Sequence, residues 1–436
     1  MEVLRFDLSK EYKAFKPLNA TNGGPWHNRR TKKMYHSNFE AYKAARIPYS
    51  RNHDLAVHTI YGGPYSHDIS RIFPSFDADP YDPKSYDFGC TDEDILTCLE
   101  AGTKTFFRLG QTIENQITKH HTLPPKDFRK WAVICEHIIR HYNYGWADGY
   151  HLDMDYWEIW NEPDLDPEDS PSKRTWGGTN AEFFDFYETA AKHLKTCFPG
   201  LKIGGPGIAH RMEWAEKFLK TMQERKVPID FLSWHTYCTK PEHIVNNAKR
   251  YRKLLDQYGY ENAESILNEW NYVKGWTDEF PYTIEMIHGI KGAAHLMACM
   301  SAAQSAPIDM LMYYDTRPSR FNGIFDFYTA KPLKSYYSLY WYGMFYDRKA
   351  EIRAAEPVED IYSLCGIDGE GKLLAAITYY SDDDNAGNKS ISVDFGRPGN
   401  YEIYLLDKEH NGEFIETTDR LEFDMKIHSV VLIREK

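Results

Sequence analysis

Two segments of the sequence carry a glutamate at the end of an apolar run. WEIWNEPDL (157–165) brings Asn161 and Glu162 to the end of one run, and SILNEWN (265–271) brings Glu269 to the end of another. Hydrolysis of a glycosidic bond with retention needs a neutral acid beside the leaving oxygen and an anion beneath the anomeric carbon, with the two carboxyl groups about 5 to 5.5 Å apart. This chemistry predicts Glu162 as the acid/base and Glu269 as the nucleophile. Taken alone, the NEP tripeptide is equally consistent with a polar turn, so the prediction depends on the pair.

Other polar residues at predicted strand ends could tune the charges of this pair. Arg51, His53, His235 and Tyr237 end apolar runs, and Asn161 precedes the first glutamate. A cation or a phenol hydroxyl near the nucleophile would hold it ionised, and the Asn161 amide could donate to a sugar 2-hydroxyl. The alternative for each residue is an ordinary polar position at the rim of a barrel. We favour a functional role for Arg51, Asn161 and Tyr237, and both interpretations stay open for His53 and His235.

The elements that would position these residues alternate along the chain. From about residue 16 to 345, short β-branched or apolar runs are followed by longer helical patterns, which is the order of parallel βαβ units. The candidate strands lie at 17–22, 48–54, 104–110, 156–162, 201–207, 230–237, 264–271 and 308–315. The helical patterns lie near 34–46, 91–101, 126–144, 179–198, 211–226, 241–259, 283–305 and 332–345. Two helix starts carry the spacing of a capping box, at Thr91 with Asp94 and at Thr179 with Glu182.

Eight strand–helix pairs favour a closed (β/α)8 barrel over an open doubly wound sheet. A doubly wound sheet usually has fewer strands and a Gly-rich dinucleotide turn, and no GxGxxG motif opens a helix in this sequence. In such barrels the catalytic groups gather at the C-terminal ends of the strands. Counting units places Glu162 on the fourth strand and Glu269 on the seventh, so the two side chains are expected to face one another across the barrel mouth.

The pattern changes after about residue 348. Short alternating runs such as IYSLCGI, LLAAITYY and SVVLIR are separated by clusters of Asp, Gly and Asn, which is typical of an antiparallel β-sandwich. The opening VLRFDL could add a strand to it and bring the two termini together. We therefore expect a catalytic α/β barrel over 12–346 and a smaller β-sandwich domain formed by 1–11 and 347–436.

Composition and charge restrict the class of partner. The net charge is −12 and the basic residues do not cluster, which argues against nucleic-acid binding. No apolar run approaches the roughly 20 residues needed to span a bilayer, so we expect no membrane partner. The seven cysteines lack CxxC spacing and are odd in number, which favours a reducing compartment and gives no metal signature. We expect no metal and no cofactor.

The start of the sequence lacks the basic segment, apolar core and cleavage site of a secretory signal. This predicts a cytoplasmic protein, with a trimmed secreted or periplasmic form left open. A homo-oligomer is also left open, because the sequence carries no signal for or against one.

Four motifs occur in an order and spacing that resemble a known group of enzymes. They are RNHD (51–54), WEIWNEPDL, FLSWHTY (231–237) and LNEWN (267–271). Together they resemble clan A glycoside hydrolases, and most of all family 39, which includes β-xylosidases and α-L-iduronidases. The resemblance covers most of the chain, including the C-terminal sandwich. Arg108 in FFRLG and the ending MYYDTRP (312–318) depart from the family's pattern and put xylose in doubt as the sugar.

The resemblance also implies roles for individual residues. It implies that Glu162 is the acid/base and Glu269 the nucleophile. It further implies that Asn161 binds the 2-hydroxyl and that Tyr237 hydrogen-bonds the nucleophile. His53 and His235 fall where the family lines the subsite for the terminal sugar.

The pattern and the resemblance together predict a cofactor-free, exo-acting retaining glycoside hydrolase that cleaves terminal sugars from oligosaccharides or polysaccharides. Exo action is inferred from the long segment 54–90, rich in Pro, Asp and Tyr, which could close one end of the cleft. The alternatives are an endo-acting glycanase of the same clan and a carbohydrate-binding barrel without turnover.

The sugar itself stays open among xylose, galactose, arabinopyranose and a uronic acid. Arg108 and Arg317 could bind a uronate carboxylate or belong to structural ion pairs. Strand alternation sends some of the candidate wall residues outward, and we favour Trp276 and Asp315 because they lie past strand ends. The full set of wall candidates is Trp157, Trp160, Trp234, Trp270, Trp276, Tyr313 and Asp315.

Overall fold

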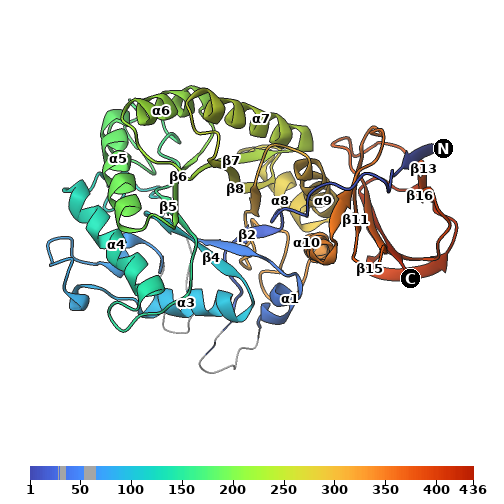
Figure 1. The fold of residues 1–436 in the computed structure, drawn as a ribbon, viewed down its shortest axis with the longest axis horizontal. Helices are drawn as coiled ribbons and strands as arrows, with labels where there is room; N and C mark the ends of the chain where they lie inside the picture. The colour runs from blue at the N-terminus through green and yellow to red at the C-terminus, as the bar shows by residue number, and fades with distance from the viewer. Residues whose placement is uncertain (28, 30–35, 54–64) are drawn as a thin grey trace.

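Eight parallel strands close into a barrel in the computed structural model, which describes residues 1–27, 29, 36–53 and 65–436 (Figure 1). All eight predicted strands are present, and the first pairs with the last to complete the closure. The (β/α)8 fold class is confirmed. The barrel strands are β2 (Ala20–Asn22), β3 (Tyr49–Asn52), β4 (Lys104–Leu109), β5 (Tyr156–Ile159), β6 (Lys202–Ile208), β7 (Phe231–Cys238), β8 (Glu264–Tyr272) and β9 (Met310–Tyr313).

Helices cover the outside of the barrel close to where the apolar patterns predicted them. The pattern over 283–305 forms two helices and not one, because the backbone at Gly289 is extended and separates them. No helix among the described residues is long and apolar enough to cross a bilayer. The helices are α1 (Phe39–Ala44), α2 (Ile69–Ile72), α3 (Gly89–Glu100), α4 (Phe128–Tyr144), α5 (Asn180–Cys197), α6 (Met212–Glu224), α7 (Pro241–Gln257), α8 (Phe280–His288), α9 (Ile290–Gln304) and α10 (Lys334–Met344), with short 3-10 turns η1 (Pro83–Ser85) and η2 (Phe345–Asp347).

One of the two predicted capping boxes forms. The Thr179 side chain accepts from the backbone N–H of Glu182, whose side chain accepts from the backbone N–H of Thr179, so α5 starts as predicted. The prediction at Thr91 is wrong, because α3 already begins at Gly89. Thr91 lies inside that helix, with its side chain hydrogen-bonded to the backbone oxygen of Ser66.

Two β-sheets form the C-terminal part. A three-stranded sheet pairs β1 (Glu2–Arg5) in parallel with β13 (Lys389–Asp394), which in turn pairs with β16 (Glu422–Met425). The opening strand therefore joins the C-terminal sheets as predicted, and both termini lie in this part of the molecule (Figure 1). The second sheet is antiparallel and has six strands in the order β10 (Ala350–Ile352), β11 (Ile361–Ile367), β12 (Leu373–Tyr379), β17 (Ser429–Glu435), β14 (Tyr401–Leu406) and β15 (Asn411–Thr418).

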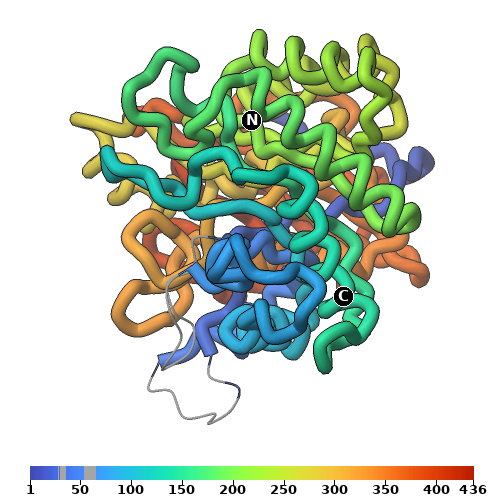
Figure 2. The backbone as a smooth tube through the Cα atoms, turned by 90° about the vertical axis from the view of Figure 1, so that its left-hand side faces the viewer, coloured from blue at the N-terminus to red at the C-terminus, as the bar shows by residue number. Residues whose placement is uncertain are grey.

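Helix α9 joins the barrel to the six-stranded sheet. It packs against β11, β12 and β17, and its Lys291 is buried between the two parts. The Lys291 ammonium pairs with Asp384 at 2.8 Å and with Asp382 at 3.3 Å. Seen from the barrel side, the C-terminal chain lies directly behind the barrel (Figure 2). The contact extends to the C-terminal end of β7, where the Tyr380 hydroxyl donates to the backbone oxygen of Thr239.

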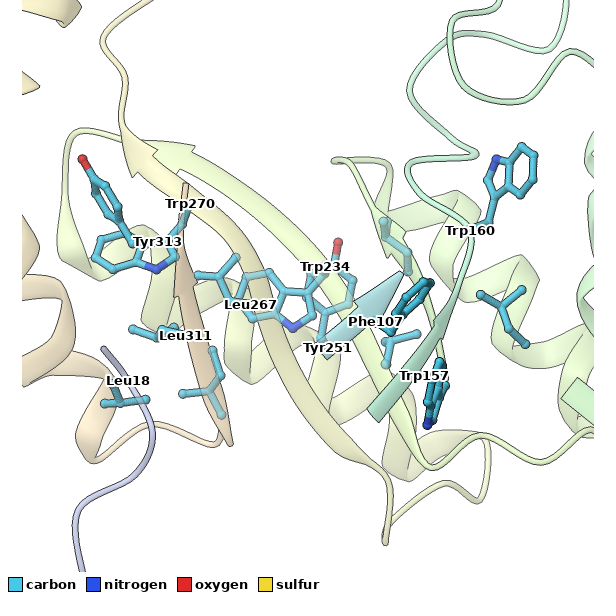
Figure 3. Close-up of a cluster of buried hydrophobic side chains, with 14 of the residues drawn as sticks. Leu18, Phe107, Trp157, Trp160, Trp234, Tyr251, Leu267, Trp270, Leu311 and Tyr313 are labelled. Atoms are coloured by element: carbon cyan, nitrogen blue, oxygen red, sulfur yellow. The ribbon is translucent and has the colours of Figure 1, made fainter. Parts of the chain in front are cut away.

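Most of the predicted wall aromatics belong to the core between strands and helices. Trp157, Trp234 and Trp270 are fully buried in this hydrophobic cluster (Figure 3). Trp160 packs there against Trp131 and other helix-layer aromatics, and Tyr313 lies edge-on to Trp270. These five candidates for the sugar-binding wall, Trp157, Trp160, Trp234, Trp270 and Tyr313, are therefore wrong, because each points into the helix layer.

Candidate active site

Glu162 lies just past the end of β5, on a backbone that turns sharply. Trp160 has a φ of 73° and Glu162 a φ of 49°, a left-handed conformation that costs free energy for residues with a Cβ. Two hydrogen bonds to the backbone hold the turn. The backbone N–H of Glu162 donates to the backbone oxygen of Gly207 at 2.9 Å, and the Thr175 hydroxyl donates to the backbone oxygen of Glu162 at 2.6 Å. The turn sends Trp160 outward and leaves Glu162 at the barrel mouth.

Asp164, two residues further on, ties this turn to the neighbouring loop. Its buried carboxylate accepts from the backbone N–H groups of Ala209, His210 and Arg211 at 2.8 to 3.1 Å. These three residues connect β6 to α6, so the carboxylate holds the loop that leads into α6. The acid-bearing turn is thus fixed on both sides.

Glu269 lies within β8, and four side chains surround its carboxylate, namely those of Arg51, His53, Tyr237 and His235. The Arg51 Nη1 donates to Oε1 at 2.7 Å, and His53 Nε2 lies 3.2 Å from the same oxygen. The Tyr237 hydroxyl donates to Oε2 at 3.0 Å. Burial by itself would raise the pKa of Glu269, but His235, His53 and Arg51 outweigh it and hold the pKa well below its usual range. Glu269 is thereby kept an anion.

The environment of Glu162 shifts its pKa in the opposite direction, upward. Burial raises its pKa, and the hydrogen bond that His235 Nδ1 donates to Oε1 at 2.7 Å only partly offsets this rise. The same His235 nitrogen lies 3.4 Å from Glu269 Oε2. Burial lowers the pKa of His235, but the two carboxylates outweigh it, so the net pKa shift is upward. The imidazole therefore links a carboxyl that favours its neutral form to one that favours its charged form.

The two carboxyl groups are close enough to act on one atom. One oxygen of Glu162, one nitrogen of His235 and one oxygen of Glu269 all lie within 4.8 Å of one another. Retaining glycosidases hold their two carboxyl groups about 5 to 5.5 Å apart, and inverting ones about 6.5 to 9.5 Å apart. Glu162 and Glu269 retain 7% and 6% exposure, so both still reach the surface of the mouth.

Glu158 is a residue of the site that sequence reasoning missed. This fully buried carboxylate on β5 accepts from Arg51 Nε at 2.6 Å. It also accepts from Ser233 Oγ and from Asn268 Nδ2, both at 2.6 Å. Glu158 thus holds the guanidinium that in turn holds Glu269. The signal was an ionisable residue inside the apolar run WEIW, a position where a carboxylate needs a buried partner.

Arg51 also fixes Asn161. Its Nη2 donates to the Asn161 Oδ1 at 2.7 Å, which leaves the amide NH2 group as the part that could donate to a sugar hydroxyl. A side chain at Gly207, where φ is +66°, would come within 3.2 Å of both Asn161 Oδ1 and His235 Nε2. Glycine is therefore required there to let these two groups approach the strand. The His235 Nε2 atom is buried and has no hydrogen-bond partner among the described residues.

The two favoured wall candidates lie at different depths. Trp276 is 57% exposed and meets the Tyr237 ring edge-on at 5.0 Å, with Phe280 and Phe321 beside it. Asp315 is buried and paired with Arg317 Nε at 2.6 Å. Burial raises the pKa of Asp315 to about 6, and its Oδ1 has no hydrogen-bond partner within the described part of the chain.

Both arginines that could have bound the carboxylate of a uronic acid lie beside aspartates of the protein. Arg317 pairs with Asp315, and Arg108 is buried with its Nη2 at 3.7 Å from Asp68. Residues 54–64 of the long segment used to infer exo action lie outside the described residues. The remainder, 65–90, contains α2 and η1.

The spacing of Glu162, His235 and Glu269 would also suit a metal ion. A divalent cation there would have to approach the Arg51 guanidinium, which already lies 2.7 Å from Glu269. Like charges at this range repel each other strongly in a buried site. The donor set therefore fits a carboxyl pair balanced by arginine better than a metal centre.

Comparison with known families matches residues 66–283 to Glycosyl hydrolases family 39, a span that contains both Glu162 and Glu269. The chain belongs to this family. Among curated relatives, the β-xylosidase of Geobacillus stearothermophilus is 30% identical over 174 residues, 39% of this chain and 32% of that protein. The β-xylosidase of Caldicellulosiruptor saccharolyticus is 32% identical over 143 residues, 32% of this chain and 25% of that protein. The chain thus spans less than a third of the length of either relative.

Solved structures share the fold of this family 39 chain over its whole length. A glucosidase from Croceicoccus marinus superposes with a TM-score of 0.81 at 20% identity, covering 100% of this chain and 99% of the other. A monomeric β-xylosidase from Caulobacter crescentus gives 0.72 at 15% identity, covering 100% and 99%. At these sequence identities the likeness shows the fold alone, that is, the barrel and the C-terminal sheets.

Proposed function

We propose that the protein is an exo-acting retaining glycoside hydrolase that works by double displacement. The observation that carries the proposal is the pair Glu162 and Glu269, which meet at the barrel mouth within 4.8 Å and have pKa values shifted in opposite directions. Retention requires this asymmetry, with the acid kept neutral and the nucleophile kept ionised. Family membership supports the same class of reaction.

In the first step the Glu162 carboxyl gives its proton to the glycosidic oxygen while a Glu269 oxygen bonds to the anomeric carbon. The bond from that carbon to the leaving oxygen breaks, and the aglycone departs as an alcohol. Oε1 of Glu162 is engaged by His235, so Oε2 is the oxygen that can present the proton. Arg51 and the Tyr237 hydroxyl hold the attacking carboxylate in place.

In the second step the Glu162 carboxylate takes a proton from water, and the water oxygen bonds to the anomeric carbon. Glu269 leaves as an anion, and Glu162 is again protonated. Because burial keeps the pKa of Tyr237 well above its ordinary value, its phenol stays a hydrogen-bond donor through both steps.

The names of the curated relatives and the side chains at the barrel mouth guide the choice of the sugar to test. Both curated relatives bear the name β-xylosidase, so a terminal β-xyloside is the first substrate to test. The exposed Trp276 and its neighbours offer an apolar face against which a sugar ring can stack. Asp315 Oδ1 and His235 Nε2 are buried polar atoms that a sugar hydroxyl could satisfy.

The test is a panel of aryl glycosides, with the anomeric configuration of the first product followed by NMR. Retention on at least one glycoside, lost in Glu162→Gln and Glu269→Gln, supports the proposal. Inversion would refute double displacement, and binding without turnover across the panel would favour a binding protein. Release of mid-chain fragments from a long oligosaccharide, in place of terminal units, would refute exo action.

A further inference from the structure

Three metal-ligating side chains meet on the outside of the barrel, between α4 and α5. Glu136 lies on α4, and His193 and Cys197 lie on α5. The His193 Nε2 is 2.8 Å from Glu136 Oε2 and 3.8 Å from Cys197 Sγ. One atom from each residue lies within 4.8 Å of the other two. The mechanism proposed above uses none of these residues.

Helix geometry explains why the three groups converge. His193 and Cys197 are four residues apart, so their side chains lie on the same face of α5. The two helices run side by side, which brings Glu136 opposite that face (Figure 1). Cys197 is the last residue of α5, where the carbonyl end of the helix dipole favours a cation.

The spacing is close to that of a tetrahedral site. Bonds of about 2.0 to 2.1 Å from zinc to nitrogen and about 2.3 Å from zinc to sulfur place those two ligands roughly 3.6 Å apart. The 3.8 Å between His193 and Cys197 needs almost no change. The 2.8 Å between His193 and Glu136 must open by about half an ångström, because the ion would replace the proton now shared by those atoms.

The surroundings hold the carboxylate ready and leave the site accessible. Arg140 Nε donates to Glu136 Oε1 at 2.7 Å, which orients the carboxylate and leaves Oε2 toward His193. His193 is 31% exposed and lines an open surface groove of about 820 Å³. With the thiol ionised, Glu136, Cys197 and Arg140 together carry one net negative charge, which favours a divalent cation.

We propose that Glu136, His193 and Cys197 bind a thiophilic divalent ion of the zinc type, with the fourth position open to water. The Cys197 thiol releases its proton to solvent as it ligates, and the His193 proton that lay between Nε2 and Glu136 passes through solvent to Nδ1, so the imidazole binds the ion as a neutral ligand. The ion joins α4 to α5 and stabilises the folded barrel by binding to it and not to the unfolded chain. The site is separate from the barrel mouth, so the basal hydrolytic activity does not depend on it.

The test is a titration of the full protein with Co²⁺, which gives a near-ultraviolet charge-transfer band only when a thiolate ligates it. The barrel-mouth cluster of Glu162, His235 and Glu269 contains no thiol and cannot give this band. We expect one equivalent of Co²⁺ to bind with the band, and binding to weaken roughly tenfold or more in Cys197→Ser and in His193→Ala.

Two control variants match these changes elsewhere on the surface. Cys90→Ser alters another partly buried cysteine, and His243→Ala alters an exposed histidine. Both should bind Co²⁺ like the unmodified protein. Zn²⁺ should raise the thermal midpoint of the unmodified protein and of both controls, and not that of Cys197→Ser. The proposal is overturned if no band forms, if the band survives in Cys197→Ser, or if Zn²⁺ leaves the midpoint of the unmodified protein unchanged.

Discussion

Replacing Arg51 by lysine tests the charge balance of the site most severely. The guanidinium donates through three different nitrogens, to Glu158 at 2.6 Å, to Glu269 at 2.7 Å and to Asn161 at 2.7 Å. A lysine carries one nitrogen and cannot occupy all three positions, so at least two of these bonds are lost. Hydrogen bonds to charged groups contribute about 1.5 to 3 kcal/mol each, which predicts a loss of about 3 to 6 kcal/mol of folding free energy.

The same change should alter the pH dependence of catalysis. Glu269 must be ionised to attack, so its pKa sets the acidic limb of the kcat/KM profile. Arg51 is one of the groups that hold this pKa low. One pKa unit corresponds to about 1.36 kcal/mol, so losing one charge-assisted bond to Glu269 moves the acidic limb up by about one to two pH units.

Both effects can be measured against a matched control. Arg225 pairs with Asp185 and Glu188 at the surface, where an ion pair contributes about 0.2 to 1 kcal/mol, so Arg225→Lys should change little. Arg51→Lys should lower the thermal midpoint by about 3 to 7 °C, because a chain of this length has an unfolding entropy of about 0.9 kcal/mol/K. The reasoning is refuted if Arg51→Lys melts within a degree or two of Arg225→Lys and its acidic limb does not move.

Three further changes have defined outcomes. His235→Asn should move both limbs of the kcat/KM profile to higher pH, because the positive imidazole lowers the pKa of Glu162 and of Glu269. A carboxyl whose pKa rises on folding stabilises the fold only while protonated, so ionisation of Asp315 between pH 3.8 and about 6 contributes a loss of about 3 kcal/mol of stability, and Asp315→Asn should remove this contribution. Thr179→Ala should cost about 1 kcal/mol of stability, because it removes the capping box of α5, and leave kcat/KM unchanged.

Each of these outcomes has a measurement that contradicts it. Limbs of the His235→Asn profile that move in opposite directions would show that the imidazole is not shared by the two carboxyls. The thermal midpoint of Asp315→Asn should depend less steeply on pH than that of the native protein between pH 3.8 and about 6. An equal dependence in both proteins would reject Asp315 as the source of this change in stability. Thr189→Ala on the same helix is the control for Thr179→Ala, because its hydroxyl bonds only within the helix. An equal loss in both variants would reject the capping explanation.

The sequence predicted the barrel because its strands are short apolar runs with clear ends. The same property located Glu162 and Glu269, since Glu162 follows the end of β5 and Glu269 lies near the C-terminal end of β8, and these ends meet at one rim of the barrel. The Thr179 cap was found because hydroxyl and carboxylate stand at the required spacing before a long helix. The same spacing failed at Thr91, where the chain was already helical from Gly89.

Side-chain direction could not be predicted where the backbone departs from regular strand geometry. The left-handed φ of Trp160 sends its ring outward, so its place beside the acid in the sequence gave no information about the site. The role of Glu158 depends on Arg51 reaching across the barrel from another strand, which no local pattern contains. Trp276 was found because it lies past a strand end, where loop residues are free to face the mouth.

The most direct test of the central claim is to trap the glycosyl-enzyme in Glu162→Gln with a dinitrophenyl glycoside. This leaving group departs without acid help, whereas the second step still needs the missing base, so the intermediate should accumulate. Mass spectrometry of the intact protein and of its peptides should find one glycosyl unit, attached to Glu269. A turnover that leaves no adduct, or an adduct on any other residue, would contradict the account.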